Sequence, residues 1–189
     1  MTIETDPEVP PRYLAAPADL AGALGEPATD PNLLRTLRRI SDRFRGAVGH
    51  QVTLTTGVVW YGSGDGGTGL ALPGRPIIGT PLVEVDGRAV TDFATGRQAG
   101  VLRRDAGWPD GLENIKVTFD YGYEEIPTDI QDAVLEVAEI AANMSAGVEN
   151  VTTGNESVKF ANSFVNGGTT EQWTETVHKY AVNTPGSRS

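Results

Sequence analysis

The sequence predicts an α+β fold, in which a helical body carries an inserted small antiparallel β-sheet. Apolar residues recur at helical spacing in three segments, near residues 17–24, 30–48 and 127–146. Between them, over about residues 51–121, the apolar period changes to two and glycines and prolines interrupt it. The length of 189 residues fits one domain with extended termini.

The first two helices have clear boundary signals. Residues 17–24 begin with proline, which is favoured in a first helical turn, and end before Gly25. In residues 30–48, Asp30 occupies the position of an N-cap and Pro31 the first helical position. The apolar stripe of this second helix consists of Leu33, Leu37, Ile40, Phe44 and Val48. The arginines of the segment fall mostly off that stripe.

The middle of the chain reads as strands. Residues 51–62 alternate in polarity, and Gly57 within them indicates a kink or a β-bulge. Two further strands are expected at about residues 100–103 and 115–121. Prolines between the strands indicate exposed sheet edges, because proline cannot donate a ladder hydrogen bond.

Two turns stand out within the predicted sheet. Asp86-Gly87, between apolar runs, predicts a tight hairpin. The glycine-rich run at 62–69 predicts a flexible loop tip. That run lacks the residue order, the lysine and the following helix of a phosphate-binding loop. It therefore favours a loop tip over a nucleotide site.

The third helix, at residues 127–146, has an apolar face and an acidic face. It starts either with Pro127 in the first helical position or with Thr128 and Gln131 as a capping box. The apolar face consists of Ile130, Val134, Val137, Ala141 and Met144. The carboxylates that point elsewhere are Asp129, Asp132, Glu136 and Glu139. They form either a solvated face or a face toward a neighbouring subunit or a lumen.

The domain organisation follows from these elements. Residues 1–12 are expected to be an N-terminal arm, 13–147 the domain itself, and 148–189 a C-terminal extension. The extension ends in a short helix at 171–180. This helix presents one apolar stripe of Trp173, Val177 and Tyr180. Because a helix this short is marginal alone, it either packs on its own core or docks on a partner.

The charge of the chain is unevenly distributed. The net charge of −10 argues against wrapping nucleic acid through phosphate neutralisation. Residues 120–150 carry acids and no base, whereas the second helix is basic. The arginines expected to form its basic face are Arg35, Arg38, Arg39 and Arg43. We expect this face to pair with the acidic helix, within one chain or between copies.

The composition offers few side chains suited to catalysis or metal binding. The chain has no cysteine, and His50 and His178 are its two histidines, which leaves most zinc and triad chemistry without ligands. We therefore expect no enzyme activity, no catalytic residue, no cofactor and no metal site. The acidic, proline-rich start is unlike a signal peptide, and no apolar run approaches a membrane span. A soluble protein that is intracellular at synthesis is expected, without membrane partners.

The order of the elements, together with several short motifs, resembles the head–tail adaptor (head–tail connector) proteins of tailed bacteriophages, especially those of actinobacterial hosts. The resemblance covers roughly residues 12 to 147. The marks that carry it are Leu72-Pro73 with Pro76, Val83 through Asp86-Gly87, Gly107-Trp108-Pro109, and Tyr121-Gly122-Tyr123 leading to Ile126-Pro127.

This resemblance implies a non-enzymatic virion protein of the neck, which is made in the host cytoplasm and assembles as a ring, usually of twelve copies. Such a ring binds beneath the portal protein, extends the DNA channel without sequence-specific binding, and provides the platform for the stopper or tail-terminator protein. Trp173, Val177 and Tyr180 then become candidates for portal or neighbour docking. The alternatives are another neck component, such as a stopper or tail-completion protein, or a small-ligand-binding domain that uses the loop at 62–69.

Overall fold

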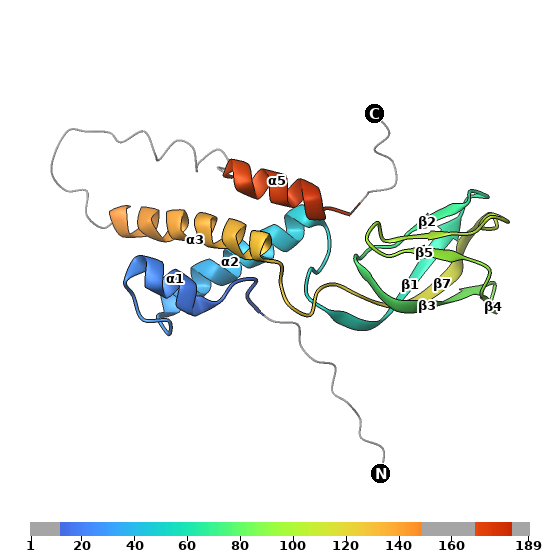
Figure 1. Cartoon of the computed structure of the whole chain (residues 1–189), viewed down its shortest axis with the longest axis horizontal. Coiled ribbons are helices and arrows are strands. Elements are labelled where there is room, and N and C mark those ends of the chain that lie inside the picture. The colour runs from blue at the N-terminus through green and yellow to red at the C-terminus, as the bar shows by residue number, and fades with distance from the viewer. Residues whose placement is uncertain (1–11, 149–168, 183–189) are drawn as a thin grey trace, which may run out of the picture. The chain divides into compact units, whose positions relative to one another are not determined.

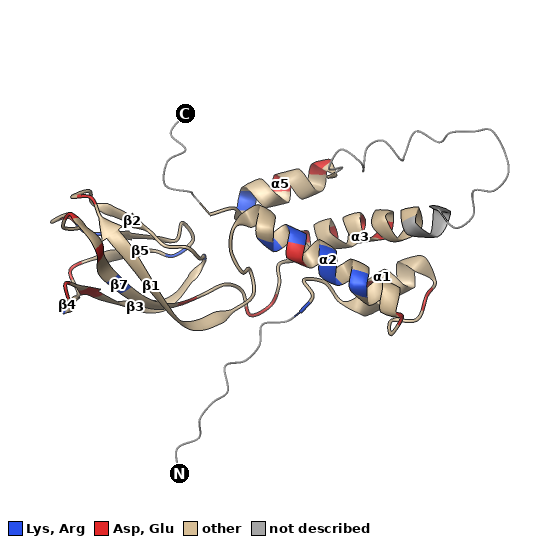
Figure 2. Cartoon of the chain, turned by 180° about the vertical axis from the view of Figure 1, so that it is seen from behind, with Lys and Arg blue, Asp and Glu red and all other residues tan. Residues whose placement is uncertain are grey.

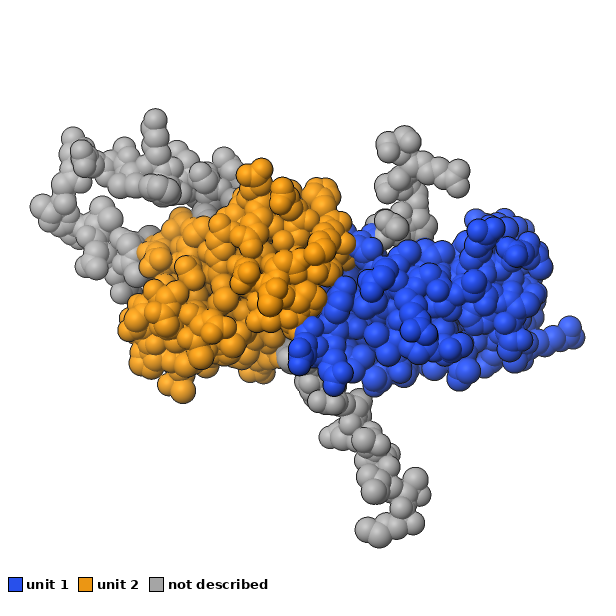
Figure 3. Space-filling view, viewed as in Figure 1, with its two compact units in different colours: residues 1–10, 49–125, 181–189 blue, residues 11–48, 126–180 orange. Residues whose placement is uncertain are grey.

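The computed structural model describes residues 12–148 and 169–182. The predicted N-terminal arm and most of the predicted C-terminal extension lie outside these ranges. The chain divides into two compact units (Figure 3). Residues 49–125 form the core of one, here called the sheet unit. The other, the helical unit, is built from residues on both sides of it, 11–48 and 126–180. The predicted α+β fold with an inserted β region is confirmed.

The first two helices begin and end close to their predicted positions. Helix α1 spans Pro17–Leu24 and is closed by Gly25, whose φ of 69° is the left-handed cap conformation that glycine favours. Helix α2 spans Pro31–Val48. The Asp30 carboxylate accepts hydrogen bonds from the backbone N–H of Asn32 at 2.8 Å and of Leu33 at 2.9 Å. The N-cap is therefore confirmed. The whole predicted apolar stripe of α2 is buried.

Helix α3 spans Thr128–Val148 and starts by neither predicted route. Pro127 precedes the helix, and its carbonyl accepts the backbone N–H of Ile130 and Gln131. The Gln131 side chain donates to the Ile126 carbonyl at 2.7 Å instead of reaching back to Thr128. The buried face of α3 includes Ile130, Ala133, Val134, Val137, Ala138 and Ala141. Its alanines permit the close approach of neighbouring helices.

Helix α5 spans Glu171–Tyr180, as predicted. It packs on α3 and α2 within the helical unit (Figure 1). The short helix of the C-terminal extension is thus part of the helical body.

The sheet unit contains two sheets where the sequence predicted one. The four-stranded sheet has the order β1-β7-β3-β4, with β1 at Thr55–Gly64, β7 at Gly111–Tyr121, β3 at Ile77–Val85 and β4 at Arg88–Val90. The three-stranded sheet has the order β2-β6-β5, with β2 at Gly69–Ala71, β6 at Val101–Arg103 and β5 at Ala94–Gly96. Pro73 and Pro76, which lack N–H groups, separate β2 from β3 and end the first short strand.

Local backbone geometry fixes the register of the four-stranded sheet. Gly57 has a φ of 65°, and the β1–β7 register shifts between Thr55 and Val58, so the predicted bulge is confirmed. Asp86 and Gly87 both have positive φ and join β3 to β4, as expected of the tight hairpin. One core packs between the two sheets. It comprises Leu70, Leu72, Ile77, Val83, Val85, Leu102, Trp108, Ile115, Val117, Phe119 and Tyr121.

Candidate interaction surfaces

The Trp173 side chain anchors α5 in the helical unit. Trp173 is only 3% exposed, and its ring meets the Phe44 ring edge-on, with centroids 5.2 Å apart and an interplanar angle of 87°. The Arg43 guanidinium lies over the same ring, 5.6 Å from its centroid. Tyr180 is also buried, and Val177 is half-buried. Of the two alternatives for this stripe, packing on its own core is the arrangement of the chain. Docking on a portal or neighbour stays a prediction.

Polar contacts fix both ends of α5 to α3. At the start, the Thr170 hydroxyl accepts the backbone N–H of Trp173 and donates to Glu136 at 2.7 Å. At the end, Lys179 Nζ lies 2.7 Å from the Asp129 carboxylate, and the Tyr180 hydroxyl donates to the same carboxylate at 2.9 Å. These contacts set the register of α5 along α3.

The Asp129 carboxylate is tuned by this environment. Burial raises its pKa, but the hydrogen bonds from Lys179 and Tyr180 together outweigh that effect, so the net pKa is lowered. Burial, followed by the hydrogen bond to Asp129, raises the pKa of the Tyr180 hydroxyl. Asp129 therefore stays ionised and Tyr180 stays neutral across the physiological pH range.

The predicted acidic face of α3 is divided between two environments. Asp129 and Glu136 both contact α5 or the residue that precedes it. Asp132 is exposed, and Glu139 is partly exposed. A lumenal or inter-subunit role for the four carboxylates stays a prediction. Asp132 and Glu139 are the two that could contact a lumen or a neighbouring subunit without disturbing α5.

Figure 2 shows the basic positions along α2 in blue. Arg35, Arg38 and Arg39 are exposed, and Arg38 pairs with Asp42 within the helix at 3.8 Å. Arg43 contacts Trp173, as described above. Among the described residues, no ion pair joins Arg35, Arg38 or Arg39 to an α3 carboxylate. Pairing of these two faces between copies stays a prediction.

The glycine-rich run at 62–69 is partly bonded within the protein, and the flexibility of its tip stays a prediction. The amide N–H of Gly64 donates to Asn114, that of Gly66 to the Trp108 carbonyl, and that of Gly67 to Asp65. A Cβ at Gly64 would come within 1.9 Å of the Pro109 carbonyl oxygen, so the two backbone segments touch. A phosphate cradle needs these amides, and here protein acceptors already use them.

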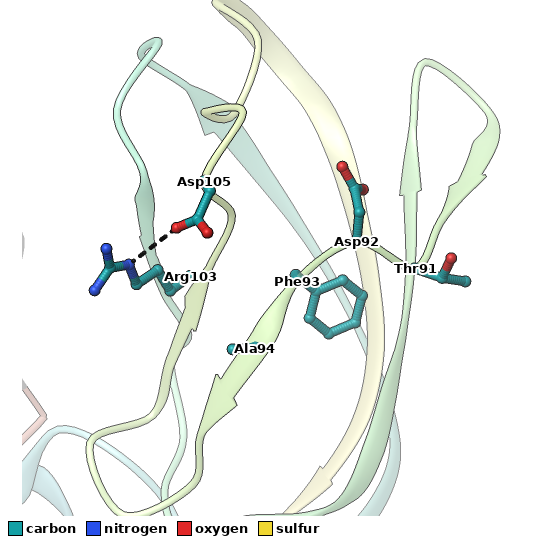
Figure 4. Close-up of a pocket in the computed structure, with 6 residues that line it drawn as sticks. All are labelled: Thr91, Asp92, Phe93, Ala94, Arg103 and Asp105. Atoms are coloured by element: carbon teal, nitrogen blue, oxygen red, sulfur yellow. Dashed lines mark ion pairs between the residues drawn. The ribbon is translucent and has the colours of Figure 1, made fainter.

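A shallow pocket lies beside β5 and β6 in the sheet unit (Figure 4). Its lining residues are Thr91, Asp92, Phe93, Ala94, Arg103 and Asp105. Arg103 pairs with Asp105 at 3.4 Å, and Asp92 accepts two hydrogen bonds from Arg104. The charges of the pocket are therefore paired with neighbours rather than directed at a common point.

Within residues 12–148 and 169–182, no group of three or more His, Asp or Glu side chains is placed to hold a metal ion. In the same ranges, no helix is long and apolar enough to cross a membrane. His50 is buried near Tyr121, with ring centroids 6.2 Å apart, and His178 is exposed.

One surface was not anticipated from the sequence. The outer face of the four-stranded sheet exposes large apolar side chains, namely Val59, Tyr61, Ile78 and Leu82. The register places Thr118 of β7 between Val59 and Leu82, and Lys116 between Tyr61 and Glu84. The signal was present in the run Val58-Val59-Trp60-Tyr61, because adjacent apolar residues on a strand must face both ways.

Comparison with known proteins shows what this fold is similar to. No protein-family model matches the chain, and no curated protein matches it. A chain in a solved structure described as the neck of an empty gene transfer agent (GTA) particle, computed with C6 symmetry, is 18% identical, with a TM-score of 0.57. A chain in the neck of a native GTA particle, computed with C12 symmetry, is 16% identical, with a TM-score of 0.51. Each match covers 96% of both chains. At these identities the likeness is one of fold.

Proposed function

We propose that this chain is a structural component of the neck of a phage-like particle, and that within the neck it is the head–tail adaptor. The observation that carries the proposal is the likeness of fold over 96% of this chain and of each similar chain, both of which lie in necks. A match over the whole of both chains supports a shared architectural role better than a match to one unit would.

The choice of adaptor over stopper rests on the helical unit. The buried face of α3 contacts α2, and α5 closes over both, so the helices form a body with a core of its own. Stopper proteins are expected to be dominated by β structure. The alternative of a small-ligand-binding domain loses support because the amides of Gly64, Gly66 and Gly67 in the glycine-rich run are already bonded within the protein.

In this proposal the adaptor is a non-enzymatic homo-oligomeric ring, with twelve copies as the expected number. The description of one similar neck as computed with C12 symmetry supports that number. The ring binds the portal protein on one side and the stopper or tail-terminator protein on the other. Genomic DNA passes through its channel without sequence-specific contacts. An acidic lining suits this passage, because it does not attract phosphates.

The direct test is electron cryo-microscopy of particles that carry this chain with a tag. The proposal expects density for a ring of this fold between portal and tail. Particles whose neck lacks the chain, or that place it in the tail or capsid, contradict the proposal. A ring next to the tail but separated from the portal by another protein would favour the stopper alternative.

The docking hypothesis for α5 has a test of its own. The Trp173 side faces the protein's own core, so docking through it requires release from α2 and α3. Truncation after Val165 should abolish portal binding, whereas Asp129→Asn, which weakens the contacts that hold α5, should strengthen it. Binding of both variants at the wild-type level, measured by co-sedimentation with purified portal, would rule out this docking mode.

The acidic-face hypothesis is tested by charge reversal. Glu139→Lys and Asp132→Lys should alter ring assembly or DNA release, because among the described residues the contacts that hold α5 to α3 use the carboxylates of Asp129 and Glu136 instead. Glu136→Lys serves as the comparison, since it also removes the hydrogen bond from Thr170. Normal rings and normal DNA release in both Glu139→Lys and Asp132→Lys would show that this face is merely solvated.

A further inference from the structure

Strand β1 forms one edge of the four-stranded sheet, and it is protected against pairing with further strands less than the opposite edge is. Among the described strands, β1 has a hydrogen-bonded neighbour on one side only, β7 (Figure 1). In an antiparallel pair every second residue turns its N–H and C=O away from the partner strand. Along the regular stretch Val58–Gly62, these groups therefore form an open row that can accept another strand.

Natural sheets usually protect such edges with charge, proline or very short strands. The opposite edge of this sheet follows the rule. Its strand β4 has three residues and begins with Arg88, and the neighbouring part of β3 contains Pro81 and a register irregularity. Strand β1 follows it less closely, because its ten residues, Thr55–Gly64, contain no charge and no proline. Its register shifts, between Thr55 and Val58 and between Gly62 and Gly64, lie outside the regular stretch Val58–Gly62. The difference singles out β1 as an edge that is kept open.

The face beside this edge is apolar as well. Val59 is 51% exposed and Tyr61 56%, and both point to the outer face of the sheet. Leu82, which lies two strands away in the same row as Val59, is 70% exposed. A strand added to β1 would cover the side chains of Val59 and Tyr61 in addition to pairing its backbone.

Electrostatics indicates what can approach this edge. Each copy of the chain has a net charge of −10, so two copies repel one another over most orientations. The surface beside β1 is an exception. The strand itself is uncharged, Lys116 is paired with Glu84 at 3.1 Å, and the Asp120 carboxylate accepts the Gly57 amide at 2.7 Å.

We propose that the open edge of β1, with Val59 and Tyr61, is a contact between neighbouring copies, in which a second copy adds an extended segment to the sheet. The inference rests on the proposed ring. Neighbours in a cyclic ring meet through two different surfaces, so the β1 edge of one copy need not pair with the β1 edge of the next. Backbone pairing provides the affinity, and the two exposed side chains provide the selectivity.

The test uses the full-length chain and three lysine variants. Val59→Lys and Tyr61→Lys place a charge at the edge, as natural edge strands do. Leu112→Lys is the matched control, because Leu112 is 89% exposed on the same sheet but lies outside the paired rows of β1. Thermal unfolding first establishes that all three variants fold like the wild type. Sedimentation velocity over a concentration series then measures self-association, and hydrogen exchange measures protection of the β1 amides.

The wild-type chain should self-associate, and its β1 amides should exchange more slowly in the associated form. Val59→Lys and Tyr61→Lys should weaken association by about tenfold or more, and Leu112→Lys should not. The proposal is overturned if the wild type stays monomeric throughout, if the two edge variants associate like the wild type, or if Leu112→Lys weakens association equally.

Imaging of particle necks separates this inference from the proposed function. A chain that lies in the neck but does not associate through β1 refutes only this inference, and a chain that associates through β1 but is absent from necks refutes only the proposed function.

Discussion

The contact of Trp173 with the helical body leads to a quantitative prediction for Trp173→Ala. A buried tryptophan removes about 150–250 Å² from water. At about 25 cal/mol per Å² this contributes roughly 4–6 kcal/mol, in line with the roughly 3–5 kcal/mol cost of truncating a buried aromatic residue to alanine. The edge-on contact with Phe44 adds about 0.5–1.5 kcal/mol beyond this area contribution.

This loss falls on α5 rather than on the whole fold. A ten-residue helix is marginally stable in water without tertiary contacts, so α5 depends on its docking. Trp173→Ala should therefore release α5 locally while α1, α2 and α3 stay folded. With about 3 kcal/mol lost, the amides of α5 should exchange roughly 100-fold faster, since each 1.4 kcal/mol corresponds to a factor of ten.

Hydrogen exchange detected by mass spectrometry distinguishes local release of α5 from unfolding of the whole helical unit. Gln172→Ala is the control, because Gln172 is exposed on the same helix and its replacement should leave exchange near the wild-type rate. The reasoning is refuted if the α5 amides of Trp173→Ala keep wild-type protection. It is also refuted if α3 loses protection in parallel, because α5 would then be integral to the fold of the helical unit rather than docked on it.

Two further predictions follow from single positions. The lowered pKa of Asp129 means that its ionised form stabilises the fold above the ordinary carboxyl pKa range, and that this contribution is lost as the pH falls through the lowered pKa. Asp129→Asn should lower the free energy of unfolding by about 1 kcal/mol at neutral pH. It should also reduce the loss of α5 hydrogen-exchange protection that the wild type shows as the pH falls. If that acid-dependent loss is unchanged in the variant, another group causes it. Gly64→Ala should destabilise the sheet unit by more than about 1 kcal/mol, because its Cβ meets the Pro109 carbonyl oxygen at 1.9 Å. Gly22→Ala, in α1 with open space around it, should stabilise the protein by up to about 1 kcal/mol in chemical denaturation, and equal losses in both variants would contradict the packing argument.

The helices could be predicted from the sequence because their signals are local. Asp30 and Pro31 mark the start of α2 within one turn, and Gly25 ends α1 through its own backbone conformation. The bulge at Gly57 and the hairpin at Asp86-Gly87 are local in the same sense. Each depends on backbone preferences that neighbouring residues determine.

The features that the sequence did not predict depend on distant residues. The glycine-rich loop looks free in the sequence because its partners, Asn114 and Trp108, come more than forty positions later. The division into two sheets depends likewise on which short strands meet. The acidic face of α3 looked uniform because the residues that divide it, Thr170 and Lys179, lie beyond the end of the helix. Sequence spacing identifies a face of a helix but not what covers it.

This coverage links two hypotheses that the sequence treated as separate. The carboxylates of Asp129 and Glu136 bind the two ends of α5, so contact of these two groups with a channel or a neighbour competes with the docking of α5. If α5 separates from α2 and α3 to reach the portal, both carboxylates lose these contacts and join Asp132 and Glu139 on one continuous acidic face. Portal docking and exposure of the full acidic face would then be a single event. A variant that releases α5, such as Trp173→Ala, should therefore bind cations more strongly along α3 than the wild type does. If α5 stays docked in the assembled ring, the inter-subunit acidic surface is confined to Asp132 and Glu139, and charge reversal at Glu136 should affect α5 before it affects assembly.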